Sequence, residues 1–238
     1  MAHHFNRQGI LLLKRTIMNI LLKKAVTAAL DVDPQKGFTF LVPELPVAGG
    51  HEIVEELNNN ARFAKYRALS RDFHPLNGNW VTKVISSIGK KISGCLRNLD
   101  LYWPEHCVAG TKGAEILDGL PDVITGYDFQ VVKGTERDSH PYGACFTDLE
   151  CKQHTGLIAQ FKMWGVENVV IGGLALDVCV KETAIQLRNW GFNVVINLAS
   201  SRAVFPDKLD DTIAELESLG VVFVQNSNEL SELFENEK

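Results

Sequence analysis

The chain has 238 residues, of which 45% are hydrophobic and 22% are charged. This composition is that of an ordinary globular domain and excludes a collagen, a coiled coil and a disordered chain. The formal net charge of -5 gives no overall basic field, so we expect no nucleic-acid partner.

Residues 1–24 are interpreted as an extension that precedes the domain. They contain five Lys or Arg residues and no Asp or Glu. Their apolar run at residues 10–13 is interrupted by Lys14 and Arg15, so it is too short for a secretory signal or a membrane span. We expect a helical extension, or a translation start placed upstream of Met18, followed by a single domain at residues 25–238. No transmembrane helix and no membrane partner are predicted.

Apolar runs rich in β-branched residues alternate with segments of helical periodicity along the domain. The predicted strands cover residues 25–32, 63–69, 123–132, 168–171, 194–198 and 221–224. The predicted helices cover residues 52–61, 149–164, 178–190 and 210–219. Short runs that are apolar on both faces and separated by helices are typical of a buried parallel sheet. We therefore predict an α/β fold, a three-layer αβα domain with a mostly parallel sheet of about six strands.

The cysteines indicate a reducing environment. There are five of them, an odd number without a CxxC pair, which is too sparse for a disulfide scaffold. We therefore expect free thiols and a cytoplasmic location.

Polar side chains follow the predicted strands at the points where those strands end. They are, in chain order, Asp33, Asp72, His74, Lys133 and Cys179. Ligands of an open α/β sheet bind outside the carboxyl ends of its strands, so we expect these side chains to share one rim.

Cys179 allows two interpretations. A free cysteine is usually a buried and inert packing residue. Cys179, however, follows a Gly-Gly turn and opens the predicted helix 178–190, where unpaired N–H groups and the helix dipole favour a thiolate and could hold an oxyanion. A nearby carboxylate such as Asp33 could accept the thiol proton, with Lys133 keeping that carboxylate ionised. Alone, Asp33 would be interpreted as a turn or cap residue.

A metal site is the second hypothesis. The spacing Asp72-Phe-His74 puts both side chains on the same face of an extended segment. With His106, from the irregular stretch 74–119, they form a two-histidine, one-carboxylate set that binds divalent metals and leaves positions open. The alternative is a solvated loop. Phe38 and Trp103 are equally compatible with core packing.

Several blocks of sequence carry a family resemblance. They are VDPQKGF at 32–38, LPVAGG at 45–50, SRDFHP at 70–75, WPEHCVAGTKGAE at 103–115, KGT at 133–135 and GGLALDVCVKETA at 172–184. They are similar, in content and order, to the signature blocks of nicotinamidase/pyrazinamidase within the isochorismatase-like cysteine hydrolases. The resemblance covers roughly residues 25–225.

The resemblance implies an αβα amidase that converts nicotinamide to nicotinate and ammonia through a thioester, in the salvage of NAD. It implies that Cys179 is the nucleophile, Asp33 the general acid and base, and Lys133 their electrostatic partner. It also implies a cis peptide bond between Leu174 and Ala175, with the N–H groups of Ala175 and Cys179 forming the oxyanion hole.

The resemblance further implies one divalent metal ion, zinc first and iron or manganese as alternatives. Its ligands would be Asp72, His74 and His106, and it would receive the pyridine nitrogen of the substrate. Phe38 and Trp103 match the aromatics that sandwich the substrate ring. The implied partners are the small-molecule substrate, nicotinamide, and other copies of the chain in a homo-oligomer.

Three places depart from the family pattern. Family members often carry another histidine or a glutamate after the Asp-x-His-Pro block, whereas residues 76–80 read LNGNW, so waters would complete the metal shell. Residues 36–37 read KG in place of Asn-Asp, and residues 142–145 read YGAC in place of Tyr-Ser-Ala-Phe. Both changes bear on the shape of the pocket.

Other functions remain open on the sequence. A related cysteine hydrolase could act on another small amide or ureido substrate. A nucleotide-binding module would carry a Gly-x-Gly-x-x-Gly turn after the first strand, and residues 33–37 read DPQKG instead. An inactive interaction protein would have lost at least one of Asp33, Lys133 and Cys179.

Overall fold

A six-stranded sheet forms the centre of the computed structural model, which describes residues 22–94 and 97–234. The strand order is β5-β4-β1-β6-β7-β8, and every neighbouring pair is parallel. The strands are β1 (Thr27–Val32), β4 (Tyr66–Asp72), β5 (Phe129–Lys133), β6 (Asn168–Leu174), β7 (Asn193–Arg202) and β8 (Val222–Val224). The predicted parallel sheet is confirmed, and its order reverses between β1 and β6, where such folds bind ligands.

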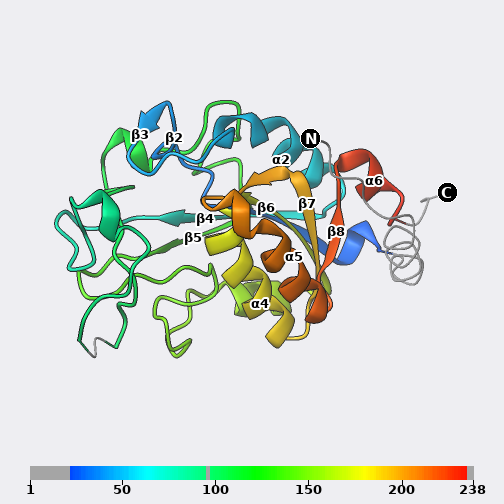
Figure 1. Cartoon of the computed structure of the whole chain (residues 1–238). Helices are drawn as coiled ribbons and strands as arrows, with labels where there is room; N and C mark the ends of the chain where they lie inside the picture. The colour runs from blue at the N-terminus through cyan, green and yellow to red at the C-terminus, as the bar shows by residue number, and fades with distance from the viewer. Residues whose placement is uncertain (1–21, 95–96, 235–238) are drawn as a thin grey trace.

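Helices cover both faces of the sheet and complete the predicted three layers (Figure 1). They are α2 (Val54–Arg62), α3 (Leu157–Met163), α4 (Lys181–Asn189), α5 (Leu209–Ser218) and α6 (Ser227–Ser231). In β6, Val169 and Ile171 join the core cluster under α3, α4 and α5, whereas Val170 joins the cluster that includes Leu230 of α6. This alternation explains why the strand is apolar on both faces.

Shorter elements complete the chain. They are β2 (Phe38–Thr39), β3 (Val42–Pro43), a π-helical turn η5 (Leu176–Val180) and the 3-10 turns η1 (Lys24–Val26), η2 (Gly50–Ile53), η3 (Ile85–Ser87), η4 (Lys112–Ala114) and η6 (Pro206–Lys208). The hairpin of β2 and β3 and the helix α6 were not predicted, since two to five residues show too little periodicity.

Two predicted elements were too long, for the same physical reason. The strand predicted from residue 123 begins only at Phe129, because the carboxylate of Asp122 accepts hydrogen bonds from the backbone N–H groups of Ile124 and Thr125 and holds a turn. The helix predicted from residue 149 begins only at Leu157, after a turn in which the Asp148 carboxylate accepts from the backbone of residues 152 and 153. Aspartate side chains compete with regular backbone hydrogen bonding in this way.

The described chain starts inside the fold. Most of the predicted extension, residues 1–21, lies outside the described residues, as does Cys95. Leu22 is buried, and its N–H donates to the carbonyl of Leu233 at 2.7 Å. Within the described ranges, no helix is both long and apolar enough to cross a membrane.

Candidate active site

The carboxyl ends of β1, β4, β5 and β6 bring the predicted side chains to one rim. Asp33 directly follows β1, Asp72 ends β4 and Lys133 ends β5. Cys179 lies in η5, the turn that connects β6 to α4. All four side chains are buried, and they lie on both sides of the point where the strand order reverses.

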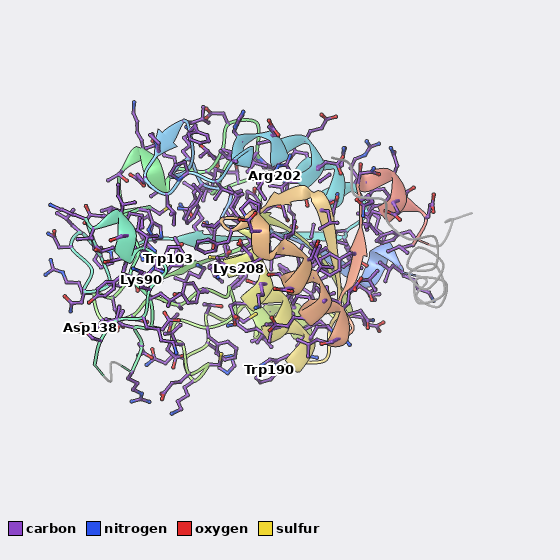
Figure 2. All side chains as sticks on the ribbon, in the orientation of Figure 1. Lys90, Trp103, Asp138, Trp190, Arg202 and Lys208 are labelled. Carbon is purple, nitrogen blue, oxygen red and sulfur yellow. The ribbon has the colours of Figure 1, made fainter. Side chains whose placement is uncertain are left out.

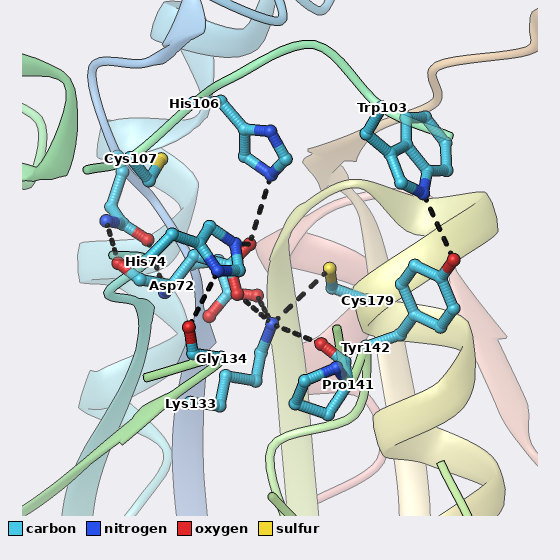
Figure 3. A network of polar contacts seen from close by, with 12 residues as sticks. Asp72, His74, Trp103, His106, Cys107, Lys133, Gly134, Pro141, Tyr142 and Cys179 are labelled. Carbon is cyan, nitrogen blue, oxygen red and sulfur yellow. Dashed lines mark hydrogen bonds and ion pairs between the residues drawn. The ribbon is translucent and has the colours of Figure 1, made fainter. Parts of the chain in front are cut away.

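Lys133 is the centre of this group (Figure 3). Its Nζ atom lies 3.0 Å from Oδ2 of Asp33 and 3.7 Å from Sγ of Cys179, and it also forms an ion pair with Asp72. The Pro141 carbonyl accepts a further hydrogen bond from Nζ at 3.5 Å. An ammonium with no solvent exposure is tolerated only when it is paired in this way.

Burial and the paired charges set the protonation of the site. Burial raises the pKa of Asp33 to about 6, although the Lys133 ammonium opposes the shift. Burial also raises the pKa of the Cys179 thiol well above its usual value, against the attraction of Lys133. Burial disfavours the charged form of Lys133, but Asp33 and Asp72 outweigh it and raise the pKa of this ammonium.

The raised pKa of the Cys179 thiol differs from the expectation of a thiolate at a helix start. Cys179 sits in a π-helical turn rather than in the first turn of α4, and its thiol stays protonated at rest. Sγ of Cys179 and a carboxylate oxygen of Asp33 lie within 4.8 Å of one another. The proton therefore has a direct acceptor when the sulfur reacts.

The backbone at the end of β6, before Cys179, lies very close to the backbone of β1. The peptide bond between Leu174 and Ala175 is cis, as the resemblance implied. Gly173 has a φ of 139°, and a Cβ atom there would lie 1.9 Å from the carbonyl oxygen of Val32. Only glycine fits at that position. Ala175 and Cys179 lie on the same turn. In this turn the carbonyl of Ala175 accepts from the N–H groups of Val178 and Val180.

Asp72 and two histidines form a second group beside the first. Oδ2 of Asp72 lies 3.5 Å from Nε2 of His74 and 3.8 Å from Nε2 of His106. Nδ1 of His74 donates to the Gly134 carbonyl at 2.9 Å, and Nδ1 of His106 donates to the Pro104 carbonyl at 2.7 Å. Because a carbonyl oxygen can only accept, these contacts place a proton on Nδ1 of each ring and leave Nε2 as the atom that faces Asp72.

This group fits a divalent cation. Nε2 of His74 is buried and has no hydrogen-bond partner within the described part of the chain. Burial lowers the pKa of His106, which keeps its ring neutral and able to bind a metal. Two imidazoles, each oriented by a backbone carbonyl, and one carboxylate are a common divalent metal set.

A small cavity lies between the two groups. It measures about 20 Å³ and has room for about one water. Its lining residues are Phe38, Leu45, Asp72, Trp103, His106, His140, Tyr142, Ala175, Val178, Cys179 and Val204. In this conformation the cavity is therefore too small for a substrate ring. A larger cavity of about 560 Å³, beside Lys36 and Arg71, contains none of the predicted site residues.

Trp103 and Phe38 both face this cavity rather than the surface. Trp103 is 2% exposed, in contrast to Trp190, which is 44% exposed at the edge of the molecule (Figure 2). Nε1 of Trp103 donates to the hydroxyl of Tyr142 at 3.0 Å (Figure 3). This hydroxyl in turn donates to Asp100 at 2.7 Å. The indole is thus held in place at the cavity wall.

Three site residues were missed from the sequence. The Ser70 hydroxyl donates to Oδ1 of Asp33 at 2.7 Å, Tyr142 holds Trp103, and His140 lies beside His74 with ring centroids 5.0 Å apart. Ser70 belongs to the SRDFHP block, so it was visible but unassigned. His140 follows the end of β5, and that position was the available signal.

Comparisons with known proteins agree with this geometry. No protein-family model matches the chain. The chain is 30% identical over 194 residues to the nicotinamidase of Acinetobacter baylyi, covering 79% of this chain and 87% of that protein. It is 27% identical over 200 residues to the Escherichia coli nicotinamidase, covering 80% and 89%.

Solved structures give the same result. The nicotinamidase/pyrazinamidase of Acinetobacter baumanii is 26% identical, with a TM-score of 0.77 over 88% of this chain and 100% of that one. The Pyrococcus horikoshii pyrazinamidase, solved in complex with zinc, is 26% identical, with a TM-score of 0.66 over 84% and 99%. In sequence over most of its length, and in fold, the chain belongs to the nicotinamidase family.

Proposed function

We infer that this protein is a nicotinamidase, an amidohydrolase that converts nicotinamide to nicotinate and ammonia. The observation that carries the inference is the buried contact of Lys133 with both Asp33 and Cys179, in a chain of this family. Nothing else in the described residues combines a nucleophile, a proton acceptor and a fixed positive charge at the point where the strand order reverses.

In the first half of the reaction, the Asp33 carboxylate takes the proton from Sγ of Cys179 as the sulfur attacks the carboxamide carbon. The carbonyl electron pair moves onto oxygen, which is held by the N–H groups of Ala175 and Cys179. When the carbonyl re-forms, the C–N bond breaks and the nitrogen receives the proton from Asp33. Ammonia leaves, and the acyl group remains on Cys179 as a thioester.

In the second half, Asp33 takes a proton from a water molecule that attacks the thioester carbon. The C–S bond breaks, the leaving sulfur of Cys179 receives that proton, and the carboxylic acid is released. Lys133 stays protonated throughout because Asp33 and Asp72 raise the pKa of its ammonium. It thereby stabilises the negative charge that moves between the carboxylate, the sulfur and the substrate oxygen.

Substrate binding is assigned to the group of Asp72 and the histidines and to the aromatic side chains beside it. Asp72, His74 and His106 would hold a divalent ion. When bound, this ion would accept the lone pair of the pyridine nitrogen and so fix the substrate ring. Zinc is our first choice, since a related pyrazinamidase holds it. Phe38 and Trp103, at the cavity wall, pack against the faces of the ring. We also propose a cytoplasmic role in NAD salvage, consistent with the free thiols of Cys107, Cys145, Cys151 and Cys179.

The experiment that tests this function is ammonia release from nicotinamide by purified, metal-supplemented protein. We expect one nicotinate for each ammonia, and activity on pyrazinamide as well. Benzamide, which has the same carboxamide but no ring nitrogen, should be hydrolysed far more slowly, because nothing fixes its ring. The absence of ammonia from nicotinamide would exclude the proposed activity, and equal rates on benzamide would exclude recognition of the ring nitrogen.

A further inference from the structure

The segment that follows β5 brings a third imidazole to the metal group. One ring nitrogen of each of His74, His106 and His140 lies within 4.8 Å of the others, and all three side chains are buried. The ring of His140 stacks on that of His74 at an interplanar angle of 17° and meets that of His106 edge-on at 78°. The three imidazoles therefore enclose a space that fits a single ion.

The contacts of the His140 ring with its neighbours leave both of its nitrogens without a hydrogen bond in the described part of the chain. The side chain is 3% exposed, and neither ring nitrogen has a hydrogen-bond partner within residues 22–94 and 97–234. Burying a polar ring without a partner costs free energy, and native proteins rarely leave that cost unbalanced. A metal ion that accepts the lone pair of one nitrogen of His140 would give that nitrogen a partner.

The fold positions this ring through its surroundings. The backbone N–H of His140 donates to the Asn98 carbonyl at 3.0 Å, and the ring packs on Trp80 with centroids 4.2 Å apart. The carbonyl of the next residue, Pro141, accepts from Lys133 at 3.5 Å (Figure 3). The backbone is thus fixed on both sides of the ring, by Asn98 and through Pro141 by Lys133, while the ring nitrogens make no hydrogen bond within the described ranges.

We propose that His140 is a further ligand of the divalent ion, which makes the set three imidazoles and the Asp72 carboxylate. The proposal rests on the metal site of the proposed function. Four such ligands would hold the ion, and the pyridine nitrogen of the substrate would take a fifth position, as zinc sites allow. From the sequence, waters are expected in this place, because no histidine or glutamate follows the Asp-x-His-Pro block. His140 supplies the missing ligand from another segment, after the end of β5.

The test is Co²⁺ binding, measured by chelator competition and by the visible absorption of the bound ion. Metal-stripped wild-type protein is compared with His140→Ala and His140→Phe. The Phe variant keeps an aromatic ring against Trp80 but has no ring nitrogen, and the Ala variant removes the ring altogether. Comparing the two separates the loss of a ligand from the loss of packing. The exposed histidine His154, changed to Ala, is the matched control.

We expect both His140 variants to bind Co²⁺ at least about a hundredfold more weakly, since losing a mere outer-shell partner already costs about 10- to 100-fold. The absorption bands of the remaining bound Co²⁺ should also change, because they depend on the number of ligands. His154→Ala should match the wild type in both measurements.

Unchanged affinity and absorption in both His140 variants would overturn the proposal. If His106→Ala loses Co²⁺ at the same time, the metal site of the proposed function stands without His140. If His106→Ala also binds normally, that metal site is wrong as well. A raised KM for nicotinamide with normal Co²⁺ binding would make His140 a substrate contact instead. Ammonia release, measured separately, tests the amidase independently of all these outcomes.

Discussion

Nζ of Lys133 lies 3.0 Å from Oδ2 of Asp33, although the strands that carry these residues are not neighbours. Lys133 ends β5, Asp33 follows β1, and β4 runs between them. The lysine side chain therefore reaches across β4, where it also pairs with Asp72. The Lys133 ammonium thus pairs with Asp33, beside the thiol, and with Asp72, beside the histidines. It connects the nucleophile to the predicted metal ligands.

The first prediction is a loss of activity at acidic pH. Burial raises the pKa of Asp33 from 3.8 to about 6, so this base becomes protonated as the pH falls below about 6. We expect kcat/KM to fall about tenfold for each pH unit below that point. Ser70→Ala removes a hydrogen bond that favours the ionised carboxylate, so the fall should begin at higher pH, by up to about one pH unit.

A pH–rate profile for nicotinamide hydrolysis checks both statements. The matched control is Ser139→Ala, which removes a buried hydroxyl that donates to the carbonyl of Thr147 and does not touch Asp33. Its profile should match that of the wild type. A fall in kcat/KM that begins only near pH 4, or one whose position Ser70→Ala does not change, would contradict the assignment of Asp33 as the base.

The second prediction concerns the nucleophile. Cys179→Ala should lower kcat by more than about a thousandfold, because no other group can form the thioester. Cys145→Ala is a suitable control, since Cys145 is equally buried and packs in the main core cluster. That variant should keep its turnover and lose only stability, as measured by kcat and by urea unfolding. Activity of Cys179→Ala within about tenfold of the wild type would show that the sulfur is not the attacking atom.

The third prediction tests the support of the metal group. Gly134 has a φ of +67°, and a Cβ atom there would lie 2.3 Å from Cε1 of His74. Gly134→Ala should therefore displace the imidazole and weaken divalent metal binding by at least about tenfold. Gly165→Ala is closely matched, because its φ is +68° and nothing lies within 4 Å of its Cβ position. Chelator competition on both variants checks this, and equal metal affinities would mean that His74 is not held by its contact with Gly134.

The buried sheet was predictable from the sequence because its strands are apolar on both faces, as Val169, Val170 and Ile171 show in β6. Asp33 and Lys133 were predictable as a pair for a related reason: parallel strands present their carboxyl ends at one edge. The rim itself is thus a consequence of the topology.

Residues placed by loops were harder to predict. His140 lies in a segment without periodicity, and its position depends on contacts with Asn98 and Trp80, which come from a distant part of the chain. The false helix start at residue 149 has a similar origin, because the Asp148 side chain holds a turn that local apolar spacing does not reveal. Such contacts depend on tertiary packing rather than on pattern.

The last prediction concerns the start of the fold. Leu22 lies before the predicted start of the domain at residue 25, yet it is 1% exposed and packs in a core cluster with Val170, Val195 and Leu230. Leu22→Ala should therefore lower the free energy of unfolding by about 2–5 kcal/mol, the usual cost of emptying such a position. A chain that starts at Met18 keeps Leu22, so we expect it to keep its turnover and most of its stability. Urea unfolding of both proteins, with size-exclusion chromatography of the truncated and full-length chains, makes the comparison. If the truncated chain loses as much stability as Leu22→Ala, or changes its assembly, then residues 1–17 contribute to the folded protein and are not an appendage.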